Sequence, residues 1–161
     1  MKSVYNFVVK PKGERYNNTK KLDGGELILN TEIFNHQYVN REAEVISIPI
    51  IGDTDIKPGD TVIVHHNVFR RWHNVKGIEK NSRAYFDEDT YFINDDQIFL
   101  YKRDDKWIVP KGYCFVIPLK AQNPFNIDME KPLQGIVKYS DGTVKVGDLV
   151  GFRPSSEYEF I

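Results

Sequence analysis

The chain contains an internal repeat, and this repeat limits the folds that the chain can adopt more than any other feature of the sequence. The segment 56–62, IKPGDTV, returns at 144–150 as VKVGDLV. Each copy follows two strand-like runs, which match in the same order: 5–9 with 113–117, and 43–46 with 134–137. Three matching segments in one order indicate a duplicated small β module.

The segment from Lys57 to Asp60 has the chemistry of a tight turn. Pro58 fixes its own φ, Gly59 accepts a positive φ, and the Asp60 side chain can bond nearby backbone amides. The β-branched run 61–64 that follows is typical of a strand. Since no apolar stripe with helical spacing runs long enough for a helix, the sequence predicts an all-β protein.

Composition argues against several classes of function. The 161 residues carry a net charge of -1, so no global basic field attracts nucleic acid. Cys114 is the single cysteine, which excludes an internal disulfide and a cysteine-based zinc knuckle. The sequence has neither a signal-peptide core nor an apolar run of bilayer length, so we expect a cytoplasmic protein without membrane contact.

The pattern also predicts the remaining strands and a boundary between two modules. We expect strands at 4–10, 90–93 and 97–101, and a loop at 12–21. The irregular stretch 67–89 is expected to form a long loop or hairpin. The charged run 102–106 is expected to join the modules, and the second copy lacks a counterpart of residues 91–101.

The order of these parts resembles that of the GroES co-chaperonin family. The family has a first strand, a loop with Gly-Gly and a hydrophobic tripeptide, a Gly-Glu-Val-like strand, a Lys-Val-Gly-Asp turn before an aliphatic strand, and a closing strand pair around an acidic turn. The matching segments are 5–10, 24–29, 43–46, 57–64 and 91–100. The resemblance implies a GroES-like, partly open β-barrel over 1–103, with a mobile loop near 16–40, and a partial second copy over 104–161.

Members of this family form rings that cap an ATP-driven chaperonin, inside which an unfolded client protein folds. The resemblance therefore implies a homo-oligomeric lid with no enzymatic activity and no cofactor, similar to the enlarged bacteriophage-encoded versions. It assigns the hinge and the apolar tip that docks on the chaperonin to Gly24, Gly25, Leu27, Ile28 and Leu29. Terminal strands pair between neighbours in the family's ring, so it places the subunit interface at Val4, Phe7, Val9, Ile98 and Leu100.

Two other functions fit parts of the sequence. One is a structural or assembly β-barrel, virion-associated for example, that makes no chaperonin contact. The other is an OB-like protein that binds single-stranded nucleic acid, because the run 69–73 with Lys76, Lys80 and Arg83 mixes aromatic rings with cations. The acidic segments 87–89 and 95–96 follow at once, so nucleic acid is the less favoured partner.

Neither a metal site nor a catalytic site is predicted. His65, His66 and His73 lie close in sequence, and histidine is a common metal ligand. Adjacent side chains on a strand point to opposite faces, however, so we do not expect His65 and His66 to share a metal. Cys114 has no histidine near it in the sequence, and no Gly-x-Ser-x-Gly motif is present, so we expect a structural cysteine and no enzyme.

Overall fold

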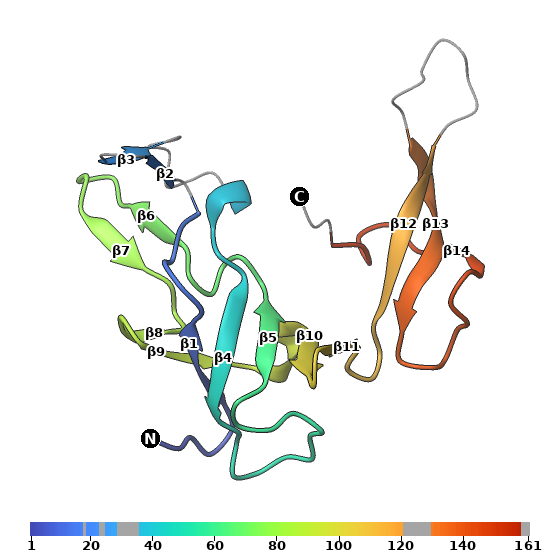
Figure 1. Ribbon diagram of the computed structural model, residues 1–161, viewed down its shortest axis with the longest axis horizontal. Helices are drawn as coiled ribbons and strands as arrows, with labels where there is room; N and C mark the ends of the chain where they lie inside the picture. Colours follow the sequence, from blue (N-terminus) through green and yellow to red (C-terminus); the bar gives the residue numbers. More distant parts are fainter. Residues whose placement is uncertain (18, 23–24, 29–35, 121–129, 159–161) are drawn as a thin grey trace. The chain divides into compact units, whose positions relative to one another are not determined.

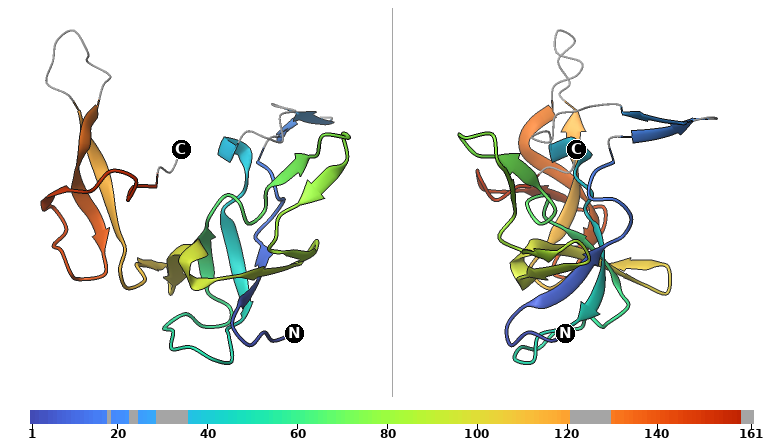
Figure 2. Two further views of the ribbon diagram at one scale, coloured as in Figure 1. Left: turned by 180° about the vertical axis from the view of Figure 1, so that it is seen from behind. Right: turned by 90° about the vertical axis from the view of Figure 1, so that its left-hand side faces the viewer.

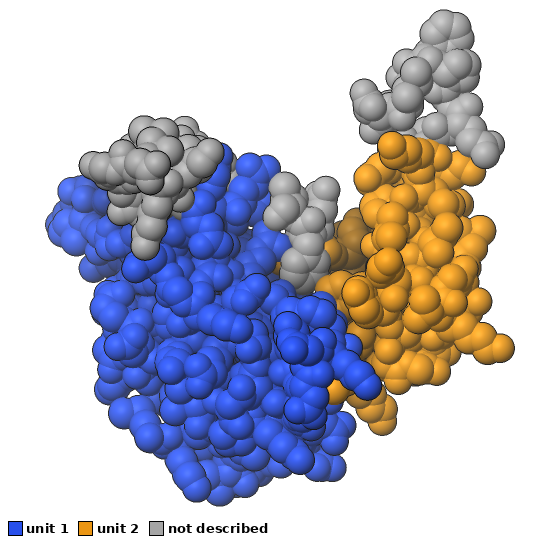
Figure 3. All heavy atoms as spheres, in the orientation of Figure 1, with its two compact units in different colours: residues 1–107 blue, residues 108–161 orange. Residues whose placement is uncertain are grey.

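The computed structural model describes residues 1–17, 19–22, 25–28, 36–120 and 130–158, and within 19–28 it describes the backbone alone (Figure 1). The described residues form β-strands, turns and two short 3-10 helices, η1 (His36–Tyr38) and η2 (Asp95–Gln97), with no α-helix among them. The prediction of an all-β protein is therefore confirmed. The chain divides into two compact units, Met1–Trp107 and Ile108–Ile161 (Figure 3), and each is described by itself.

Unit 1 is built on a seven-stranded sheet. Its strands, in spatial order, are β11 (Lys106–Ile108), β10 (Ile98–Arg103), β5 (Thr61–Val64), β4 (Glu42–Ser47), β1 (Phe7–Pro11), β9 (Thr90–Ile93) and β8 (Tyr85–Asp87). In Figure 1, β8 and β9 run across the direction of β1 and β4, so the sheet is strongly twisted. Two hairpins form separate two-stranded sheets: β2 (Thr19–Leu22) with β3 (Gly25–Ile28), and β6 (Arg71–His73) with β7 (Glu79–Asn81).

The core of unit 1 follows the two-residue period of its strands. Burial alternates along β4, β5 and β9, because successive side chains on a strand point to opposite faces. The largest buried side chain is Tyr91, and Phe69 packs edge-on against it with ring centroids 4.7 Å apart. Each fully buried aliphatic side chain contributes about 1.5–3 kcal/mol to stability. The remaining core residues on the sheet include Val8, Val9, Ala43, Val45, Val62, Val64, Ile93 and Ile98.

The Lys57–Asp60 turn adopts the predicted geometry and gains a partner from β10. Gly59 has φ +91°, and the Lys57 amide donates to Asp60 Oδ2 at 2.8 Å. The buried Asp60 carboxylate also accepts from Arg103, with Nε to Oδ1 at 3.0 Å and Nη2 to Oδ2 at 2.5 Å. This bidentate pair ties the turn before β5 to the end of β10.

Unit 2 repeats three adjacent strands of unit 1. Its sheet has the order β12 (Cys114–Lys120), β13 (Glu130–Ser140), β14 (Leu149–Gly151), with antiparallel pairing, as in β1–β4–β5. The first two strands carry a register shift at the same place, between Val8 and Val9 in unit 1 and between Phe115 and Val116 in unit 2. The Cα partners correspond one to one: Val9 with Val45 and Glu44 with Thr61 in unit 1, and Val116 with Val137 and Ile136 with Leu149 in unit 2.

The repeated turns share their backbone hydrogen bonds as well. In each, the glycine amide donates to a carbonyl of the preceding strand and the lysine amide donates to the aspartate side chain. The distances are 2.8 Å for Gly59 N to Val45 O, 2.9 Å for Gly147 N to Val137 O, and 3.1 Å for Lys145 N to Asp148 Oδ2. The strand register makes Val9 of unit 1 equivalent to Val116 of unit 2. The sequence alignment of 5–9 with 113–117 had placed Val9 against Ile117, so it is shifted by one residue.

Two expectations about connecting segments need correction. The segment 102–106, expected to link the two modules, forms the turn of a β-hairpin between β10 and β11. Asp104 and Asp105 have φ of 48° and 60°, a conformation that aspartate tolerates in such turns. The segment 12–21, expected as a loop, includes the start of β2. The stretch 67–89 does contain a hairpin, formed by β6 and β7, and also the strand β8, and its turn residues separate strands of only three residues each.

Candidate docking surfaces

The hairpin formed by β2 and β3 carries the predicted docking segment. Cα partners run from Thr19 with Ile28 to Leu22 with Gly25, and within the described residues neither strand joins the seven-stranded sheet. Figures 1 and 2 show this hairpin and β6–β7 at the same end of unit 1. Of the predicted docking residues, Gly25, Leu27 and Ile28 lie on β3, whereas Gly24 and Leu29 lie outside the described residues.

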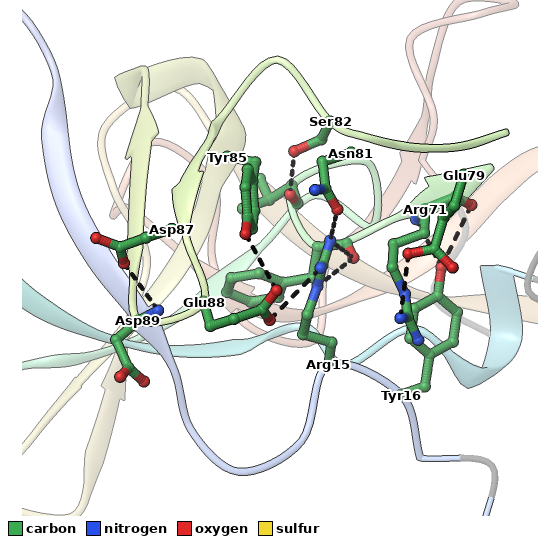
Figure 4. A network of polar contacts seen from close by, with 12 residues as sticks. Arg15, Tyr16, Arg71, Glu79, Asn81, Ser82, Tyr85, Asp87, Glu88 and Asp89 are labelled. Atoms are coloured by element: carbon green, nitrogen blue, oxygen red, sulfur yellow. Dashed lines mark hydrogen bonds and ion pairs between the residues drawn. The ribbon is translucent and has the colours of Figure 1, made fainter. Parts of the chain in front are cut away.

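A buried arginine lies immediately before this hairpin and fixes the chain there (Figure 4). Arg15 is 8% exposed, and its Nε and Nη2 donate to the Phe69 carbonyl at 3.2 and 3.1 Å. Nη2 also donates to Oδ1 of Asn81, the last residue of β7, at 2.9 Å. The guanidinium lies 5.3 Å from the Tyr85 ring centroid and 5.6 Å from that of Tyr91, so cation–π contacts help to stabilise the buried charge.

Tyr16, the next residue, makes contacts with β6 and with Val39. Its hydroxyl accepts from the Arg71 amide at 2.7 Å, and the Arg71 guanidinium lies 5.0 Å from the Tyr16 ring centroid and 3.4 Å from Glu79 Oε1. Tyr16 also forms an antiparallel bridge with Val39, and both residues are buried. The two ends of segment 17–38 are therefore held together. We call Arg15, Tyr16, Arg71, Glu79 and Asn81 the root network.

Most of the predicted subunit-interface residues lie inside unit 1. Phe7, Val9 and Ile98 are at most 2% exposed, and β1 is an inner strand with β4 on one side and β9 on the other. Val4 precedes β1 and is exposed, and Leu100 on β10 is half-buried. The first three side chains therefore stabilise the core of their own unit and are not available for contact with a neighbour.

The histidines lie differently from the arrangement expected on a strand. Because β5 ends at Val64, His65 and His66 do not alternate across a sheet, and their ring centroids are 4.3 Å apart. The His36 ring centroid lies 5.1 Å from that of His66. Burial is the main cause that lowers the pKa of His66 to about 4, and the charge of Arg70 contributes. Among the described residues, no group of three or more His, Cys, Asp or Glu side chains is placed to hold a metal ion.

The basic and aromatic run 69–73 is divided between two environments. Phe69 is fully buried in the core, and Arg71 belongs to the root network. Arg70 and Trp72, which alternate with these residues, line a cavity together with Arg83. The sequence shows which residues this run contains. Which of them face the core and which face the cavity depends on the position of β6. Cys114, the first residue of β12, is exposed.

Unit 2 presents an apolar row where unit 1 presents a polar one. Ile117, Ile136 and Leu149 are partners across its three strands and are 53%, 41% and 64% exposed. At the corresponding positions unit 1 has Lys10, Glu44 and Thr61, and Lys10 forms an ion pair with Glu44 at 3.2 Å. No described strand pairs with the outer edges of β12 and β14, whereas β9 and β10 cover the equivalent edges in unit 1.

Within the described residues there is no helix with the length and hydropathy that crossing a membrane requires. When the chain is compared with known proteins, no family model, no curated protein and no solved structure matches it.

Proposed function

We propose that the chain is a co-chaperonin-like lid that binds the rim of an ATP-driven chaperonin through the β2–β3 hairpin and so assists protein folding. The observation that carries this proposal is the hairpin itself: it pairs within itself, it lies apart from the main sheet, and the root network fixes its base. On this hairpin Leu27 and Ile28 pair with Lys20 and Thr19, outside the main sheet, and we infer that a partner binds there.

The energetics favour weak contacts repeated in an oligomer. Burial of the three aliphatic side chains of Leu27, Ile28 and Leu29 would contribute about 5 kcal/mol before the cost of association. Because β2 and β3 are already paired and Tyr16 is bridged to Val39, part of the ordering cost is met before binding. A homo-oligomer, a ring in the family that the sequence resembles, would multiply these contacts by avidity.

The direct test is binding of the full chain to an ATP-loaded bacterial chaperonin, measured by sedimentation. The test variant combines Leu27→Ala, Ile28→Ala and Leu29→Ala. The matched control combines Ile50→Ala and Ile51→Ala, which truncates two exposed aliphatic residues elsewhere in unit 1. We expect the control to bind as the native chain does and the triple variant to lose binding. Absence of binding by the correctly folded native chain would overturn the proposal.

A second candidate function, an assembly subunit without chaperonin contact, is favoured by the apolar row of unit 2. Exposed strand edges and an exposed apolar face are the features through which β proteins associate with further copies. A variant that transfers the polar row of unit 1, Ile117→Lys with Ile136→Glu and Leu149→Thr, would then be monomeric where the native chain is oligomeric. Analytical ultracentrifugation measures the mass of the native chain and of the variant, and a native chain that is monomeric at high concentration would exclude this candidate.

A further inference from the structure

Unit 1 contains an open cavity of about 510 Å³ that lies away from the β2–β3 hairpin in sequence. Its lining comes from three separate segments: Asn67, Arg70 and Trp72 from the first, Arg83 from the second, and Gln97 at the end of η2. The volume lies within the range of about 300–1,000 Å³ that is usual for small-molecule sites.

Two cations of the lining have no anionic partner in the described part of the chain. Neither Arg70 nor Arg83 forms an ion pair there, although Arg15, Arg71 and Arg103 all do. The Arg70 Nε is buried without a hydrogen-bond partner. The cavity lining therefore carries two guanidinium groups with no carboxylate paired to either among the described residues.

The other lining groups suit a planar ring. Trp72 on β6 is half-buried, and neither its indole N–H nor the Asn67 side-chain amide makes a hydrogen bond to another described residue. An indole stacks on a nucleobase whatever its identity, and a guanidinium matches a phosphate with two parallel hydrogen bonds. The cavity thus combines anion-binding groups with a stacking surface.

We propose that this cavity binds a nucleotide, with the phosphate on Arg70 and Arg83 and the base against Trp72. The site does not depend on the proposed lid function, because it uses none of the docking residues. The same chemistry is offered by a free mononucleotide and by one unit of a single-stranded nucleic acid, and the experiment separates these two sources.

The test uses the fluorescence of Trp72 in the full chain with Trp107→Phe, which leaves Trp72 as the single tryptophan. AMP and a 12-nucleotide single-stranded DNA are titrated separately at low and high salt. We expect saturable quenching that weakens with salt. Arg70→Gln and Arg83→Gln should each weaken binding about tenfold, as expected for the loss of a charge-assisted hydrogen bond. Arg153→Gln, an exposed arginine of unit 2, is the matched control and should bind unchanged.

Each outcome decides a specific point. Quenching by AMP and by the DNA supports a mononucleotide site, and quenching by the DNA alone supports a site for one unit of a strand. Quenching by neither ligand overturns the proposal. Native-like affinity in the Arg83→Gln variant, whose exposed side chain is not needed for the core, overturns it as well.

Discussion

Asp60 and Asp148 occupy the same position in the two copies of the turn, and each accepts a hydrogen bond from the lysine amide three residues earlier. They differ in the partner that tertiary structure adds. Asp60 is 6% exposed and paired with Arg103, whereas Asp148 is exposed and has no such arginine beside it among the described residues. The repeat therefore provides an internal control for the effect of one buried ion pair.

We predict that Asp60→Asn is more destabilising than Asp148→Asn at neutral pH, by about 1–3 kcal/mol. The hydrogen bond from Arg103 holds the pKa of the Asp60 carboxyl below its usual 3.8, so the carboxylate stabilises the folded state above that pH. This contribution is lost as the pH falls below about 3.8 through the lower pKa of the folded state. Urea unfolding at pH 7 and pH 3, followed at amide signals of each unit, measures the difference, and an equal cost at pH 7 would refute the argument.

Arg15 provides a second test at the residue scale. Arg15→Lys keeps the charge, but an ammonium on a flexible stem cannot reproduce the guanidinium fork between the Phe69 carbonyl and Asn81. We expect a loss of about 2–3 kcal/mol in the free energy of unfolding by urea. Arg153→Lys, at an exposed position of unit 2, should change it little. A loss of similar size in both variants would show that the buried geometry of Arg15 is not the cause.

At the scale of the elements, the β2–β3 hairpin differs from every strand of the main sheet because it pairs only within itself in the described part of the chain. An isolated two-stranded hairpin is marginally stable in water. Lys102 on β10 is a useful comparison, because it pairs with Thr61 of β5 inside the main sheet.

We therefore predict that limited trypsin digestion of the free protein cuts at Lys20 and Lys21 well before Lys102, with early cleavage confined to 16–31. Mass spectrometry of the first fragments measures the order of cutting. Cleavage at Lys102 first, or general resistance of 16–31, would argue that the hairpin is packed on the body of the protein and would weaken the docking proposal.

At the scale of the whole molecule, the two units differ greatly in how much they bury. Among the described apolar residues that are buried, all lie in unit 1 except Val109 and Val137. A three-stranded sheet with so little buried surface gains little stability by itself. Unit 1 has the seven-stranded sheet and the aromatic core, so we expect it to be stable without unit 2.

This difference predicts that a fragment ending at Pro110, which retains β11, keeps the folded state of unit 1. Its urea midpoint should lie close to that of the first unit in the full chain, because the buried side chains of the sheet are all present. Residues 111–161 alone should show little cooperative unfolding at low concentration. A fragment 1–110 that fails to fold would show instead that unit 2 is needed for the fold of unit 1.

The sequence by itself determined the all-β class, the two Lys-x-Gly-Asp turns and the repeat, because these depend on local chemistry: the φ of Gly59 and Gly147, the side-chain cap of each aspartate, and β-branched strands. Only the tertiary structure decided which side chains remain on a surface. It buried Phe7, brought the ring of His36 beside that of His66, and divided Arg70 from Arg71, because each outcome depends on how segments far apart in the chain come together, which local pattern does not specify.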